Sequence, residues 1–238
     1  MKTENLEYRD VEGQCYVGFL VTPDAANGAA VIVAHNAPGV SDFERGVARR
    51  LGEAGYFAFC ADYIGDGAVL GPAALGARLG PLVEDPSRVR GAMRAALAAL
   101  TAQPGVNAAR VAAIGYCFGG AAALELARAG ERVAAVVGFH SSLPVNRPED
   151  CARIGGKVLI QQGAADPMVP PEVRTQFEAQ MNAAGVDWCM ILFGGVLHGF
   201  TVPGSEALGM PGVAYDAAAD ARSWRAMRDL FAESIDRN

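Results

Sequence analysis

The sequence predicts an α/β fold with a mainly parallel central sheet and helices on both faces. Short apolar runs of strand length alternate with longer amphipathic or Ala-rich segments along most of the chain. Such alternation is typical of βαβ units, in which helices bury both faces of a parallel sheet. Residues 111–120 add a third observation: an apolar run ends in Gly-x-Cys-x-Gly, and an Ala-rich helical segment follows. In such a sheet the ligand is expected beyond the carboxyl ends of the strands.

Each element follows from its own pattern. The apolar runs predict strands at residues 5–21 (a hairpin with its turn at 10–13), 29–34, 56–61, 110–114, 133–139, 157–161 and 186–193. Helices are predicted at residues 42–54, 86–102, 119–129, 171–184 and 213–235. Asp42 is a candidate N-cap with Gly55 closing that helix, and Pro86 suits a first helical turn. The glycine-rich residues 64–81 show little pattern, so they predict a mobile loop, a cap or an irregular connection.

Composition narrows the class of protein. The chain has 238 residues, half of them hydrophobic, which suits one domain over residues 1–238, and no internal repeat or linker divides it. No apolar run is long enough to span a membrane, and the polar start predicts a cytoplasmic protein. A net charge of −6 without a basic stripe argues against nucleic acid as a partner. The five cysteines are scattered and form no Cys-x-x-Cys, so neither a disulfide framework nor a zinc site is expected.

The Gly-x-Cys-x-Gly segment has the layout of a nucleophile elbow with cysteine in place of serine. Gly115 and Gly119 are expected to be required because a Cβ at either position would clash with the close-packed strand and helix. The helix that follows directs its N-terminal N–H groups at Cys117, where they would stabilise a thiolate and a developing oxyanion. The alternative is a buried structural cysteine ahead of a glycine turn.

A cysteine nucleophile needs a base and a group that orients the base. His198 and Asp166 each follow a predicted strand, so both are expected on the same rim of the sheet as Cys117. The chain order nucleophile, acid, histidine is that of α/β-hydrolases. Taken singly, Asp166 before Pro167 could be a turn residue, and His198 among glycines could be an exposed loop residue. The joint pattern favours a Cys117–His198–Asp166 triad.

Other polar residues also end strands. His140 is a candidate for the pocket wall, and His35 is expected to brace the loop after its strand. Asp62 and Tyr63 could shape the pocket or serve the turn before the glycine-rich segment.

Residues 115–120 read Gly-Tyr-Cys-Phe-Gly-Gly, and together with the Asp166 turn and residues 198–200 they resemble the dienelactone hydrolase family. The resemblance covers nearly the whole chain. It implies an α/β-hydrolase fold without a large cap domain. It further implies hydrolysis of an ester or enol-lactone through a thioester, with no metal or cofactor.

The resemblance also implies a role for each residue. Cys117 would attack the carbonyl, His198 would transfer the proton, and Asp166 would orient the imidazole. The backbone N–H groups of Phe118 and Ala37 would form the oxyanion hole.

The chain departs from the family pattern at two places. Asn36 stands where members with dienelactone activity usually carry a glutamate that contacts the cysteine and helps to control its ionisation. An amide cannot accept a proton at neutral pH, so the thiolate would depend more on His198 and the helix N-terminus. The arginine expected shortly after the histidine is absent, and Arg78 is the nearby candidate for the other carboxylate-binding arginine.

These observations favour a cysteine hydrolase that acts on a small, fairly neutral ester or lactone, as a monomer or homodimer. The predicted pocket residues are Asn36, Tyr63, Arg78, His140 and Phe200. An acyltransferase or thioesterase would use the same acyl-cysteine. Asn36 favours a third possibility, a retired hydrolase scaffold that binds a ligand or senses oxidants through Cys117.

Overall fold

Eight strands form one sheet in the order β1-β2-β4-β3-β5-β6-β7-β8 in the computed structural model, which describes residues 1–145 and 147–236. The strands are β1 (Lys2–Arg9), β2 (Cys15–Thr22), β3 (Ala30–Ala34), β4 (Phe57–Ala61), β5 (Val111–Tyr116), β6 (Ala135–Phe139), β7 (Lys157–Gly163) and β8 (Trp188–Phe193). The β1–β2 hairpin and the β2–β4 pair are antiparallel, and the strands from β4 to β8 are parallel. Residues 146 and 237–238 of the predicted domain lie outside the described residues.

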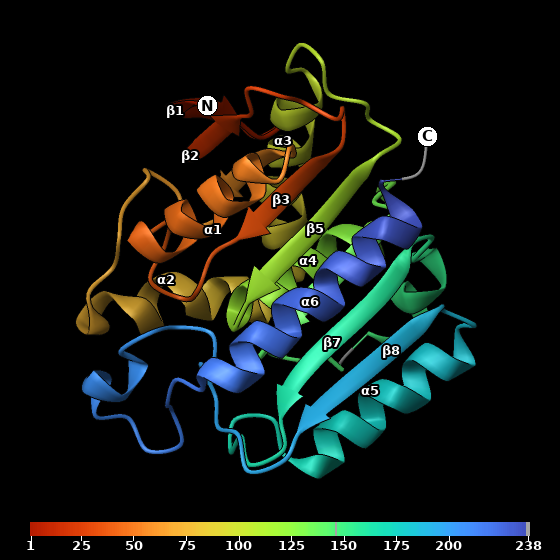
Figure 1. The fold of residues 1–238 in the computed structure, drawn as a ribbon. Coiled ribbons are helices and arrows are strands. Elements are labelled where there is room, and N and C mark those ends of the chain that lie inside the picture. Colours follow the sequence, from red (N-terminus) through yellow and green to blue (C-terminus); the bar gives the residue numbers. More distant parts are fainter. Residues whose placement is uncertain (146, 237–238) are drawn as a thin grey trace.

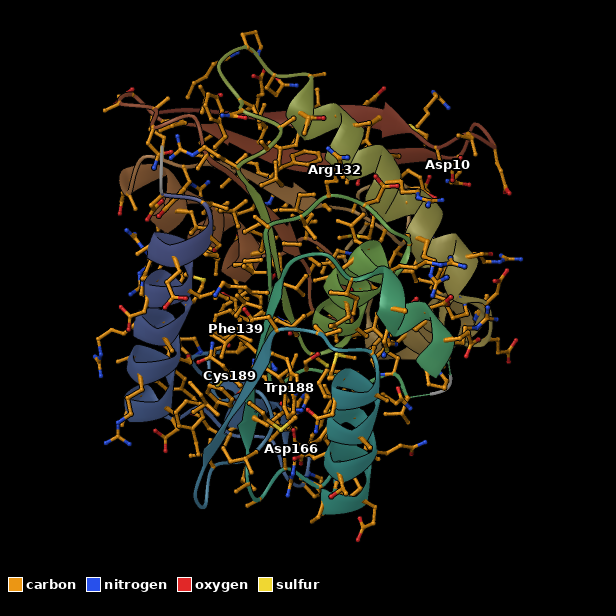
Figure 2. All side chains as sticks on the ribbon, turned by 90° about the vertical axis from the view of Figure 1, so that its right-hand side faces the viewer. Asp10, Arg132, Phe139, Asp166, Trp188 and Cys189 are labelled. Atoms are coloured by element: carbon orange, nitrogen blue, oxygen red, sulfur yellow. The ribbon has the colours of Figure 1, made fainter. Side chains whose placement is uncertain are left out.

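Helices cover both faces of the sheet (Figure 1). The helices are α1 (Asp42–Glu53), α2 (Pro72–Glu84), α3 (Pro86–Thr101), α4 (Phe118–Arg128), α5 (Pro171–Ala183) and α6 (Ala217–Ser234), with 3-10 turns at Pro148–Arg153 and Ser205–Leu208. Helices α1 and α6 lie on one face, and α3, α4 and α5 on the other. Figure 2 shows these layers nearly edge-on, with α6 and α5 on opposite sides. The predicted fold class is thereby confirmed.

Alternation along the central strands divides the core into two layers. In β3, Val31 and Val33 belong to the same core layer as Leu51 of α1 and Phe231 of α6, whereas Ile32 belongs to the layer that contains residues of α3, α4 and α5. All five residues of β3 are buried, as expected for a parallel strand that is covered on both faces. The carboxyl ends of the parallel strands therefore meet at one edge, which carries the loops described below.

The N-terminus of α1 corrects one prediction. Ser41, not Asp42, is the N-cap: its hydroxyl accepts a hydrogen bond from the Phe43 N–H, and the Glu44 carboxylate accepts one from the Ser41 N–H. This arrangement is a capping box, whose Ser-x-x-Glu signature is present in residues 41–44. Asp42 instead lies in the first turn, where its negative charge interacts favourably with the positive end of the helix dipole.

The glycine-rich segment at residues 64–81 is more regular than predicted. Its second half begins α2, and its first half is held by Asp62, whose carboxylate accepts hydrogen bonds from the N–H groups of Ile64, Gly65 and Gly67. Glycines and Pro81 lower helix propensity, which is why this helix was not predicted from the sequence.

Among the helices of the described residues, none combines the length and the apolar character that crossing a membrane requires.

Candidate active site

Cys117 occupies the turn between β5 and α4, at the carboxyl edge of the sheet. Its φ of 55° and ψ of −119° are unusual for a residue with a side chain and mark a strained turn. Hydrogen bonds hold this backbone on both sides: the Cys117 N–H donates to the Phe139 carbonyl at 3.1 Å, and the Ser142 N–H donates to the Cys117 carbonyl at 2.9 Å. The half-buried thiol therefore stands at the N-cap of α4, facing the positive end of the helix dipole.

Two glycines make this turn possible. A Cβ on Gly115 would lie 2.0 Å from the carbonyl oxygen of Gly119, and a Cβ on Gly119 would lie 2.3 Å from that of Ala34. Contacts this short with backbone atoms cannot be relieved by a side-chain movement. The predicted need for glycine at both positions is confirmed.

Asp166 and His198 are in contact at the same edge of the sheet. Asp166 follows β7, and its buried Oδ2 atom lies 2.8 Å from Nδ1 of His198, which follows β8. Its other oxygen, Oδ1, accepts a hydrogen bond from the Met168 N–H at 2.8 Å. Asp166 therefore serves its turn and orients the imidazole at once. It lies near the lower end of the sheet in Figure 2.

The backbone around His198 is held by a segment that the sequence predicted to be helical. Helix α6 begins at Ala217 rather than at residue 213, because Asp216 caps it by accepting hydrogen bonds from the N–H groups of Ala218 and Ala219. Val213 instead forms a parallel bridge with His198. The His198 N–H donates to Gly212, and its carbonyl accepts from Ala214. This pairing fixes the loop that presents the imidazole.

The electrostatic surroundings of His198 favour its protonated form. Burial opposes the charge, but the hydrogen bond to Asp166 and the interactions with Cys117 outweigh it and raise the pKa of His198 to about 10. Its Nε2 atom is buried and has no conventional hydrogen-bond partner among the described residues, which leaves it available to Cys117.

A titration of His198 by NMR should report this coupling. Replacing Cys117 by alanine removes an interaction that raises the pKa of His198, so this pKa should fall from about 10. Because the folded-state pKa exceeds the value of about 6.5 for an unfolded histidine, protonation of His198 stabilises the fold fully below about pH 6.5. This contribution is lost as the pH rises toward 10. An unchanged pKa in Cys117→Ala would show that the thiol does not interact with the ring.

The N–H groups of Ala37 and Phe118 have no assigned backbone or side-chain acceptor among the described residues. Phe118 opens α4, and Ala37 lies in the loop between β3 and α1, after Asn36. The Asn36 side chain donates to a buried carboxylate, Glu44 Oε1, at 3.0 Å. The loop that carries Ala37 is therefore tied to α1.

His35 and Tyr63 form a buried stack next to this loop. Their rings lie 3.8 Å apart and almost parallel, and the Tyr63 hydroxyl donates to the His35 carbonyl at 2.5 Å. Burial, followed by the nearby Cys117 charge, raises the pKa of Tyr63 well above its ordinary value, so the hydroxyl remains a donor. Nδ1 of His35 contacts the Asn36 carbonyl. Both rings therefore contact the backbone at the start of the loop that carries Ala37.

The Arg78 side chain binds the neighbouring loop at residues 64–66. One guanidinium nitrogen donates to the Ile64 carbonyl at 2.9 Å and lies 3.6 Å from a carboxylate oxygen of Asp66. This geometry gives Arg78 a local role in holding residues 64–66.

The His140 ring packs against the rings of His198 and Phe200. The His140 ring lies 5.0 Å from the His198 ring and 5.3 Å from Phe200, both edge-on. Its Nε2 atom lies 2.8 Å from the Thr201 hydroxyl, and burial together with His198 lowers the pKa of His140 well below its ordinary value. His140 is therefore a neutral ring packed against the candidate base, at a backbone φ of 37°.

A cavity of about 400 Å³ opens beside the elbow, between α2, α3, α4 and the segment after β6. Phe118 alone of the residues predicted from sequence lines it. The remaining wall is mostly apolar and consists of Leu82, Val83, Pro86, Val89, Ala121, Ala122, Glu125, Ser142, Leu143, Pro144 and Val145. No pattern in the sequence predicted this wall, although residues 142–145 come soon after a strand, which is the position where ligand contacts are expected.

No cluster of three or more His, Cys, Asp or Glu side chains suited to a metal ion occurs in the part of the chain that the structure describes.

Comparison with known proteins supports the fold. The family model described as "Dienelactone hydrolase family" matches residues 17–235. The chain belongs to the dienelactone hydrolase family. It is accordingly a hydrolase of this family, and the resemblance seen in the elbow and histidine motifs is confirmed.

Several relatives resemble this dienelactone hydrolase family member closely. A solved structure named m3DLH is 42% identical, with 98% of each chain covered and a TM-score of 0.94. A dienelactone hydrolase-like promiscuous phosphotriesterase from metagenomic libraries is 38% identical, again over 98% of each chain, with a TM-score of 0.92. An uncharacterized Caenorhabditis elegans protein is 32% identical over 150 residues, which are 60% of this chain and 92% of that protein.

Proposed function

We propose that this protein hydrolyses small, neutral carboxylic esters or lactones through an acyl-cysteine intermediate. The contact between His198 Nδ1 and Asp166, with the imidazole coupled to Cys117, carries the proposal. The proposed nucleophile, acid and histidine also follow one another along the chain in the order used by α/β-hydrolases, which supports the proposal.

The reaction would proceed in two halves. Sγ of Cys117 attacks the carbonyl carbon, and His198 donates its proton to the leaving alkoxide, so that the C–O bond breaks and a thioester forms. Water then gives a proton to His198 and adds to the thioester carbonyl. The C–S bond breaks, the acid leaves, and Cys117 and His198 share the proton again. Asp166 holds the imidazole in orientation in both halves.

The negative oxygen of each tetrahedral intermediate needs hydrogen-bond donors. The N–H groups of Phe118 and Ala37 are the candidates, because neither has an assigned acceptor among the described residues. The N-terminus of α4 adds its partial positive charge to the same place.

Two observations favour a neutral substrate. The cavity beside Phe118 has a mostly apolar wall, and its one charged side chain, Glu125, is already paired with Arg90 and Arg128. Arg78 is occupied by the loop at residues 64–66. A substrate carboxylate would thus find no free arginine in this cavity among the described residues. An apolar acyl or aryl group fits its wall better.

The first test compares p-nitrophenyl acetate with dienelactone. Wild-type protein should hydrolyse the acetate with the higher kcat/KM, because dienelactone carries a carboxylate. Cys117→Ala should abolish turnover, whereas Cys189→Ala, which changes an exposed cysteine on β8, should leave it intact. Turnover that survives in Cys117→Ala would contradict the cysteine mechanism. Faster turnover of dienelactone would contradict the preference for neutral substrates.

Two further assays separate the other activities that Cys117 could support. Added alcohols or thiols should leave the product a free acid, whereas acyl transfer to them would indicate an acyltransferase. Peroxide oxidation of Cys117 without any ester turnover would indicate a redox sensor. A neutral aryl phosphotriester is a useful additional substrate because a relative 38% identical in sequence is described as a promiscuous phosphotriesterase.

A further inference from the structure

Glu44 is a fully buried carboxylate for which the reaction above gives no role. It lies in the first turn of α1, and its side chain faces the loop that joins β3 to this helix. It accepts four hydrogen bonds. Oε1 receives the Asn36 N–H at 2.9 Å and the Asn36 side-chain amide at 3.0 Å, and Oε2 receives the Ser41 N–H at 2.9 Å and the Ser41 hydroxyl at 2.6 Å.

Helix capping explains only half of this arrangement. A capping box requires Glu44 to bond the N–H of Ser41, the residue three positions before it, and capping-box glutamates need not be buried. The two bonds to Asn36 reach to the far end of the loop. Burying a charge is unfavourable unless hydrogen bonds compensate. The buried position of Glu44 therefore indicates that this side chain has a role besides capping the helix.

The residue that these bonds fix adjoins the candidate oxyanion donor. Asn36 is held through both its backbone and its side chain, so the orientation of the peptide that bears the Ala37 N–H is restricted. The same loop closes on itself through a hydrogen bond from the Gly39 N–H to the Asn36 carbonyl. Glu44 thus accepts hydrogen bonds from the loop at positions 36 and 41, on either side of Ala37.

We propose that Glu44 is a positioning residue for catalysis: its buried carboxylate locks Asn36 and thereby aims the Ala37 N–H at the oxyanion. This inference rests on the proposed hydrolase function. It also gives Asn36 a defined part, as the amide through which a carboxylate on α1 controls the loop. Such an effect acts on the transition state rather than on substrate binding.

Glu44→Gln tests the proposal. One amide cannot accept all four hydrogen bonds, because its NH₂ group meets a donor at either Asn36 or Ser41. Removing a whole oxyanion donor costs about 10²- to 10³-fold in kcat, so a loosened Ala37 should lower kcat for p-nitrophenyl acetate by about 10- to 100-fold. KM should stay within about threefold, as expected when an interaction made only in the transition state is lost.

Ser41→Ala is the matched control. It removes the helix cap to the Phe43 N–H and one bond to Glu44, but it leaves both bonds from Asn36 to Glu44. It should lower stability, by about 1 kcal/mol for a lost cap, with kcat changed by less than about threefold. Alkylation of Cys117 by iodoacetamide, followed by mass spectrometry, supplies a second readout. That reaction forms no oxyanion, so Glu44→Gln should leave its rate unchanged.

Asn36→Asp keeps the proposal testable if Glu44→Gln does not fold. It places a second carboxylate about 3.0 Å from Glu44 Oε1. Two carboxylates so close cannot both ionise without repulsion, so the pair retains a proton at low pH and separates as the pH rises. The kcat of Asn36→Asp relative to wild type should therefore decline with rising pH, and Asn36→Ala should show no such decline.

The outcomes are distinct. A kcat for Glu44→Gln that matches Ser41→Ala, or a flat pH ratio for Asn36→Asp, would overturn the positioning role while the cysteine mechanism stands. A fall in alkylation rate as large as the fall in kcat would also overturn it, because the effect would then lie on the thiol. Ester turnover that persists in Cys117→Ala would instead remove the proposed function, and the role of Glu44 with it.

Discussion

Replacing His198 by alanine should lower kcat for p-nitrophenyl acetate by about 10³-fold or more, which is within the range lost with a general acid–base group. The imidazole takes part in both halves of the proposed reaction, and its Nδ1 atom lies 2.8 Å from the Asp166 carboxylate that orients it. Stopped-flow and steady-state rates at pH 7 would measure the loss.

Asp166→Asn gives the graded comparison. An asparagine preserves the shape and can still bond the Met168 N–H, but it removes the charge that raises the pKa of His198. Its kcat should lie between those of wild type and His198→Ala, and the pKa of His198 should fall. A His198→Ala variant that retains more than about a tenth of wild-type kcat would contradict general-base catalysis, which usually contributes at least about 10²-fold.

The parts of the site that the sequence predicted best are those tied to strand ends. Cys117, Asp166 and His198 each follow an apolar run, and the parallel sheet brings such positions to one edge whatever the intervening helices do. The elbow could also be predicted from the sequence, because any chain with this turn needs residues without a Cβ at the two glycine positions.

What the sequence concealed depends on contacts between distant segments. Helix α2 was read as a loop since its glycines and Pro81 lower helix propensity, and packing on α3 overrides that preference. Val213 was assigned to a helix, but it bridges to His198, which no periodicity reveals. The burial of Glu44 was hidden in the same way: residues 41–44 show a capping signature, while the bonds to Asn36 exist only in the folded loop.

The predicted substrate pocket shows the same limit. Tyr63, His140 and Phe200 are buried and support the loops and the imidazole, and Arg78 holds its own loop. The apolar cavity is instead lined by α2, α3, α4 and the segment after β6, so its shape depends on how the helices pack. The roles of these residues toward substrate remain predictions.

Gly115→Ala should lower the free energy of unfolding by about 3 kcal/mol, the upper end of what overpacking usually costs, and should abolish ester turnover in the protein that still folds. The new Cβ would lie 2.0 Å from the Gly119 carbonyl oxygen and 2.5 Å from the Gly120 nitrogen. Relief requires α4 to move away from β5, and that movement displaces Cys117 from His198 and from the candidate oxyanion donors.

Gly91→Ala is the matched control, since Gly91 lies inside α3 with nothing within 4 Å of the added Cβ. There the same substitution should stabilise the protein by about 0.5–1 kcal/mol, because alanine is the better helix former. Urea unfolding would measure both variants, and turnover would be assayed in parallel. If Gly115→Ala unfolded like wild type and kept its activity, strand and helix would not be packed as closely as the elbow demands. If both variants lost stability equally, the cost would belong to the loss of glycine as such and not to its place beneath Cys117.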